Sequence, residues 1–197
     1  MRNITPSYLW VTNMDNYKII MKRTISVIAI IILGIIILSG FTTLVKTTNV
    51  NSFYTIPKEL TERVKYDTQG MDGEQIVKYC VILTAELLSF SQKEDLSKNE
   101  ANCIGYSKIC TSLCNYSFKI NKIDFRAKHV RGYVSLFSIN LCAILRFISP
   151  SEYKDFVKDH DFVEIDFNNG KYILVDPSIY DLTGSMLTTQ ICSINEK

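Results

Sequence analysis

The chain has 197 residues, of which 47% are hydrophobic and 21% are charged. Its 22 Lys and Arg nearly balance its 20 Asp and Glu, so the net charge is only +2, with no block of like charges after residue 45. The composition therefore leaves room for one ordinary globular domain and excludes the strongly basic surface that a nucleic-acid partner requires.

Residues 1–23 read as a short polar tail in the cytoplasm, and residues 24–45 form an apolar run without any charge. Such a run is long enough to cross a bilayer core of about 30 Å as one helix. More basic residues stand directly before the run than directly after it, which predicts a single-pass anchor in the cell membrane with the main domain outside the cytoplasm. If translation starts at Met21 instead, the same run is a secretory signal peptide.

Residues 46–71 read as a juxtamembrane linker that includes a short helix from Pro57, and residues 72–197 read as the globular domain. Asp72 and Gln75 have the spacing of a capping box, which predicts that a helix begins there. Apolar residues then recur with helical period to about Ser89.

A third helix is predicted over "NCIGYSKICTSLCNYSF", with Asn102 as its cap and Cys103 in its first turn. Free N–H groups and the helix dipole at that end stabilise a thiolate, so Cys103 is a candidate nucleophile. Cys110 and Cys114 lie deeper in the helix, and we expect them to be small buried apolar residues. The cysteine spacing lacks a C-x-x-C pair, and no metal site is expected.

A strand is predicted from about Phe125 to Val134, followed by "SLFSINLCAILRFI", which reads as a helix whose first part could extend the strand. His129 lies within the strand, and because no acidic residue follows at a matching spacing we expect a structural role for it. Gly132 indicates either a close backbone approach or a bulge.

The segment "DHDFVEIDFNNGKYILVDPS" predicts a β-hairpin, residues 159–178. Alternation places His160 and Phe162 on one face, and Gly170 suits a left-handed position in the connection. If Phe167 pairs with its counterpart Lys171, Asp176 falls opposite Phe162 on that face, diagonal to His160 and within side-chain reach. A register slip of one residue would separate them.

A histidine held by a carboxylate forms two thirds of a catalytic triad, because the acid fixes the ring tautomer and stabilises the imidazolium. His160 and Asp176 are the candidates for these roles, and Cys103 is the candidate nucleophile. The neighbouring acidic residues alternate between faces, which favours a solvated edge over a calcium site. They are Asp159, Asp161, Glu164 and Asp166.

Four motifs in order resemble the transglutaminase-like domain of the papain-like cysteine enzyme superfamily: "NCIGYSKICTSLC", "RAKHVRGYV", "DHDFVEID" and "YILVDPSIYD". The resemblance covers about residues 72–181 and implies an α+β fold with helices packed on an antiparallel sheet. It also implies Cys103 as nucleophile, His160 as general base and acid, and Asp176 as orienting acid, without a metal or organic cofactor. Phe162 departs from the pattern, since tryptophan is common there.

Two functions follow from the resemblance. The first is a membrane-anchored extracytoplasmic enzyme that transfers or hydrolyses the acyl group of an amide in a peptide or protein substrate. Cross-linking, hydrolysis and deamidation all proceed through an acyl-enzyme and stay open. The second is a catalytically inactive domain of the same fold that binds peptides or assembles partners at the membrane.

Overall fold

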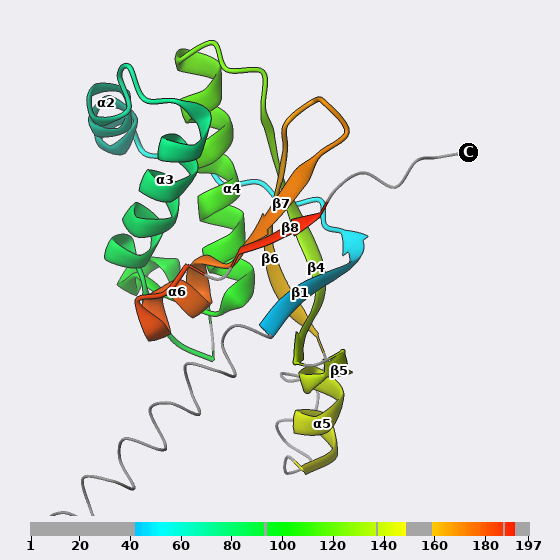
Figure 1. Ribbon diagram of the computed structural model, residues 1–197. Coiled ribbons are helices and arrows are strands. Elements are labelled where there is room, and N and C mark those ends of the chain that lie inside the picture. The colour runs from blue at the N-terminus through cyan, green and yellow to red at the C-terminus, as the bar shows by residue number, and fades with distance from the viewer. Residues whose placement is uncertain (1–41, 93, 137, 149–158, 187, 192–197) are drawn as a thin grey trace, which may run out of the picture. The chain divides into compact units, whose positions relative to one another are not determined.

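A computed structural model describes residues 42–92, 94–136, 138–148, 159–186 and 188–191 (Figure 1). The tail and the predicted membrane span lie outside the described residues, apart from 42–45. Over the described ranges, no helix has the length and apolar character needed to cross a membrane.

Strand β1 (Thr42–Asn49) occupies residues that the sequence divides between the end of the span and the linker. The compact unit to which β1 belongs begins at Thr42. Alternation along β1 buries Leu44 in an apolar cluster with Val130, Phe162 and Leu174. Burial of this kind explains why the last residues of an apolar run belong to the sheet.

The helices expected before the hairpin are present. Helix α2 (Lys58–Asp67) starts directly after Pro57. Helix α3 (Gly73–Leu87) begins with the predicted capping box of Asp72 and Gln75. Helix α4 (Cys103–Ile120) is capped by the side chain of Asn102, the residue before it. Between α3 and α4 lie β2 (Ser89–Phe90), the short 3-10 helix η1 (Leu96–Lys98) and β3 (Glu100–Ala101), with β2 and β3 paired in parallel.

One curled antiparallel sheet has the strand order β1-β4-β6-β7-β8, with β5 paired to β4. Its further strands are β4 (Arg126–Leu136), β5 (Ile139–Asn140), β6 (His160–Asp166), β7 (Tyr172–Val175) and β8 (Thr188–Ile191). Helices α2, α3 and α4 gather on one side of this sheet (Figure 1). The α+β class with helices on an antiparallel sheet is therefore confirmed.

Two short helices complete the described chain. Helix α5 (Leu141–Ile148) confirms the helix expected after the long strand, whereas Ser135 and Leu136 extend β4. Helix α5 projects from the end of the sheet, away from the other helices (Figure 1). Helix α6 (Pro177–Thr183) follows β7 directly and packs against α3 and α4.

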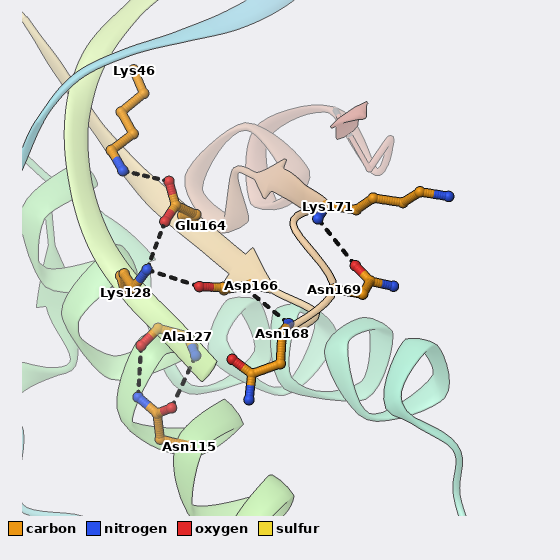
Figure 2. A network of polar contacts seen from close by, with 9 residues as sticks. All are labelled: Lys46, Asn115, Ala127, Lys128, Glu164, Asp166, Asn168, Asn169 and Lys171. Atoms are coloured by element: carbon orange, nitrogen blue, oxygen red, sulfur yellow. Dashed lines mark hydrogen bonds and ion pairs between the residues drawn. The ribbon is translucent and has the colours of Figure 1, made fainter. Parts of the chain in front are cut away.

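Polar contacts tie the sheet together and tie it to α4 (Figure 2). Glu164 is almost fully buried and receives Lys46 Nζ at 2.5 Å and Lys128 Nζ at 3.2 Å, so that β1, β4 and β6 meet at one carboxylate. The Asn115 side chain of α4 donates to the carbonyl of Ala127 and accepts from its N–H, both at 2.9 Å.

The acidic residues of β6 do not form the solvated edge expected from the sequence. Asp161 and Glu164 are 1% and 3% exposed, respectively, and both are paired with cations. A buried carboxylate requires such partners because desolvation of an unpaired charge is costly. The expectation was wrong because alternation specifies the face on which a residue lies but not what covers that face.

Gly132 is a position of close backbone approach, as predicted. A Cβ atom there would lie 1.9 Å from the carbonyl oxygen of Val45, and the β1–β4 register shifts between Lys46 and Thr48. Only glycine lets β1 come this near to β4.

Candidate active site

The register of the hairpin is the predicted one. Val163 lies opposite Val175, and the Phe167 N–H donates to the Lys171 carbonyl at 3.1 Å. Gly170 has the expected positive φ of 76°. Continued by one residue, this register places Asp176 opposite Phe162, diagonal to His160.

Asp176 is fully buried and has a different partner on each oxygen. Its Oδ1 atom accepts from the N–H groups of Ser178 and Ile179, both at 3.0 Å, and from the Ser178 hydroxyl at 2.7 Å, which caps helix α6. Its Oδ2 atom bonds Nε2 of His160. Burial disfavours the carboxylate, but His160 and the capping donors outweigh it and lower the pKa of Asp176.

His160 begins β6 and lies between Asp176 and Cys103. Because its Nε2 faces the carboxylate, Nδ1 is the ring nitrogen left for the sulfur, and the ring interacts with both residues. Burial disfavours the imidazolium, yet Asp176 and then Cys103 outweigh it, so the pKa of His160 is raised well above its ordinary value. When the ring is neutral, the bond to Asp176 favours the tautomer with the proton on Nε2.

Cys103 is the first residue of α4 and is partly exposed. The Asn102 side chain accepts from the N–H groups of Ile104 at 3.1 Å and Gly105 at 3.4 Å, and not from that of Cys103. The structure therefore brings all three predicted site residues together, with the sulfur at a helix N-terminus beside an imidazole.

A cavity of about 320 Å³ opens at these residues. Cys103 and His160 lie on its wall, and most of the remaining lining is apolar. That lining consists of Phe90, Val134, Leu141, Cys142, Asp159, Ser178, Ile179 and Leu182.

Tyr106 lies one turn after Cys103 and is fully buried. Its hydroxyl donates to Asp181 Oδ2 at 2.6 Å, and burial followed by this bond raises the pKa of Tyr106 well above its usual range. The bond joins α4, which carries the nucleophile, to α6, which Asp176 caps. Local sequence patterns could not predict this contact because Asp181 lies 75 positions away.

Three further thiols of the described residues lie in the core. Cys80, Cys110 and Cys114 are fully buried between α3 and α4, and bonds to Cys110 and Cys80, with burial, raise the pKa of Cys114. Burial of Cys110 and Cys114 confirms the sequence prediction. The part of the chain that the structure describes holds no cluster of three or more His, Cys, Asp or Glu side chains suited to a metal ion.

His129 has an acidic partner that its own strand did not reveal. Its Nε2 lies 2.9 Å from Asp161 Oδ1, and its Nδ1 lies 2.5 Å from Ser52 Oγ. The partners come from β6 and from the segment after β1, so local spacing could not find them.

No protein-family model, no curated protein and no solved structure matches the chain. A function has therefore to be inferred from the residues of the site and their geometry.

Proposed function

We propose that the protein is a transglutaminase-like cysteine enzyme that transfers or hydrolyses the acyl group of an amide through Cys103. The observation that carries the proposal is the placement of His160, with Nε2 on a buried carboxylate and Nδ1 left for the sulfur. A carboxylate in this position stabilises the imidazolium that forms beside a thiolate. The order of residues in the four motifs supports the same family.

In the proposed reaction the Cys103 thiolate attacks the amide carbonyl, forming a C–S bond and a tetrahedral oxyanion. The Cys103 N–H, which the Asn102 cap does not use, is a donor for this oxyanion. His160 then gives its Nδ1 proton to the leaving amine as the C–N bond breaks. Water or a second amine, deprotonated by His160, resolves the thioester.

The cavity favours a substrate with an apolar side chain near the amide. Phe90, Leu141 and Ile179 lie on its wall, and a volume of about 320 Å³ fits one large side chain together with the backbone that carries it. Asp159, whose carboxylate also lies 3.6 Å from Arg131 Nε, is the acidic side chain of the lining and would face a basic or amide group of the substrate.

We further propose that the part of the apolar run before β1, residues 24–41, anchors the enzyme in the cell membrane with its catalytic domain outside the cytoplasm. The uncharged run and the excess of basic residues before it support this placement. Peptides or proteins of that compartment are then the substrates.

Alkylation with iodoacetamide tests the chemistry without a known substrate. Cys103 is expected to react fastest in the reduced, folded chain and to remain reactive near pH 6, since an adjacent imidazolium favours the thiolate. Cys110 and Cys114 are expected to stay slow because they are buried. Peptide mapping by mass spectrometry reads out each site.

The reaction is then identified by incubating the wild type and Cys103→Ala with glutamine-containing peptides and peptides derived from the cell wall, and by comparing the products. Products that require Cys103 support the enzyme. If Cys103 is alkylated at the rate of an ordinary thiol, and His160→Ala does not change that rate, the domain is instead the inactive peptide-binding module.

A further inference from the structure

Strand β6 carries two histidine–carboxylate pairs, one on each face. His160 and its neighbour Asp161 point to opposite sides of the strand because side chains alternate. His160 pairs with Asp176, whereas Asp161 pairs with His129 of β4. The second pair is therefore separate from the Cys103 site and plays no part in its proposed chemistry.

The second pair continues to a hydroxyl. Ser52 Oγ lies 2.5 Å from Nδ1 of His129, and Nε2 of the same ring lies 2.9 Å from Asp161 Oδ1. Because the carboxylate accepts a hydrogen bond from the Nε2–H group, the Nδ1 lone pair of the neutral ring faces the Ser52 hydroxyl. The His129 ring is oriented like that of His160, because its Nε2 faces a carboxylate and its Nδ1 faces the side chain of Ser52.

Burial holds this arrangement rigidly. The His129 and Asp161 side chains are each 1% exposed, and Arg131 Nε also approaches the carboxylate at 3.4 Å. Ser52 is less buried and lines a cavity of about 310 Å³ together with His129. A fixed base and acid thus lie behind an accessible hydroxyl.

The same cavity contains a buried polar atom without a protein partner. Thr111 of α4 lines it, is 8% exposed, and its Oγ1 forms no hydrogen bond with any residue that the structure describes. A buried hydroxyl of this kind is costly unless something bonds it. Thr111 thus places an unsatisfied hydroxyl beside the cavity, with the Oγ1 atom itself buried.

We propose that Ser52, His129 and Asp161 form a second acyl-transfer site, with Ser52 as nucleophile, His129 as general base and Asp161 as its orienting acid. Its substrates are small esters with polar acyl groups, because Asn49, Asn51 and Thr111 are on the cavity wall. An ester suits the site because an alcohol leaves more readily than an amine.

The reaction balances with water as the second reactant. Ser52 Oγ bonds the carbonyl carbon as its proton passes to Nδ1 of His129, and the C–O bond to the alcohol breaks as the alcohol takes that proton. Water, deprotonated by His129, then cleaves the acyl-serine to release the carboxylic acid and restore the Ser52 hydroxyl.

The Ser52 hydroxyl is not needed merely to hold the segment after β1 against β4. The Val50 N–H already donates to the His129 carbonyl at 2.8 Å, and Asn49 pairs with Val130, so backbone bonds hold this segment to β4. The hydroxyl adds a contact to the ring of His129, and both residues line the cavity.

A fluorophosphonate probe tests the site on the full-length chain. Attack by Ser52 forms an O–P bond and expels fluoride, and mass spectrometry locates the adduct. We expect an adduct at Ser52 in wild type and in Cys103→Ala, which lacks the other proposed nucleophile. His129→Gln is expected to slow labelling at least about 100-fold, since a general base contributes roughly that much or more.

Ser97→Ala is the matched control, because Ser97 is an exposed serine bonded to Asp95 and lies outside the cavity. Ser52 in the Ser97→Ala variant is expected to be labelled at the wild-type rate. The absence of an adduct at Ser52 in the folded wild-type chain overturns the proposal without any variant. Equal labelling in a folded His129→Gln chain overturns the role of the histidine.

Discussion

Replacing Asp176 by asparagine separates its two contacts. Oδ1 of Asp176 accepts from the N–H groups of Ser178 and Ile179, whereas Oδ2 bonds Nε2 of His160. Both N–H groups need an acceptor, so the amide oxygen of the variant takes the Oδ1 position and the NH₂ group faces the ring. The NH₂ group donates to Nε2 and moves the ring proton to Nδ1, which is the wrong tautomer.

The opposite rotamer of the amide would restore the bond to His160 but would leave the two helix donors without an acceptor. Each buried unsatisfied donor costs about 1–3 kcal/mol, hence about 2–6 kcal/mol in total, against about 1 kcal/mol for the regained bond. The wrong tautomer therefore prevails. In a triad with this defect, turnover falls by about 10⁴-fold.

The alkylation rate of Cys103 measures the same effect without a substrate. Without the carboxylate, burial lowers the pKa of His160, and the thiolate loses its contacting cation. The loss of an opposite charge at this range changes the ionised fraction of a thiol by about 10- to 1000-fold, so alkylation at pH 6 should slow by that factor.

Asp95→Asn is the control for this change, because the Asp95 carboxylate bonds Ser97 and Lys98 and no histidine. Cys103 in the Asp95→Asn variant should be alkylated at the wild-type rate. An unchanged rate at pH 6 in Asp176→Asn would refute the role assigned to Asp176. A thermal melt of both variants checks that the fold persists.

Three further outcomes are expected. Gly132→Ala should lower the free energy of unfolding in urea by about 1–3 kcal/mol, since its Cβ would overlap the carbonyl of Val45, and a wild-type midpoint would contradict that contact. The pair of His160 and Asp176 should stabilise the fold most between pH 3.8 and 6.5. The folded-state pKa of His160 is raised, so its contribution is lost as the pH rises above 6.5 and through that pKa. The folded-state pKa of Asp176 is lowered, so its contribution is lost as the pH falls below 3.8 and through that pKa. Urea unfolding of Asp176→Asn at pH 5 and pH 9 should thus differ more from wild type at pH 5, and an equal difference would exclude the linkage. Protease added to intact cells should digest residues 46–197, and protection of them until lysis would reverse the proposed topology.

The sequence alone determined helices α2 to α5, the long strand β4 and the hairpin. The caps at Asp72 and Asn102, and the turn at Gly170, are set by side chains within a few residues of the backbone groups that they serve. Because a hairpin couples its register to its turn, the meeting of His160 and Asp176 followed from the same short stretch. Cys103 could be placed at a helix end for the same local reason.

Only the tertiary structure decided which distant elements cover each face. Strand β1 joined the sheet, Asp161 and Glu164 became buried, and Tyr106 met Asp181 through contacts between residues far apart in the chain. His129 likewise acquired Asp161 and Ser52 from two other segments. Periodicity assigns a residue to a face, but the packing of other elements on that face sets its burial and its partners, and these fix its chemistry.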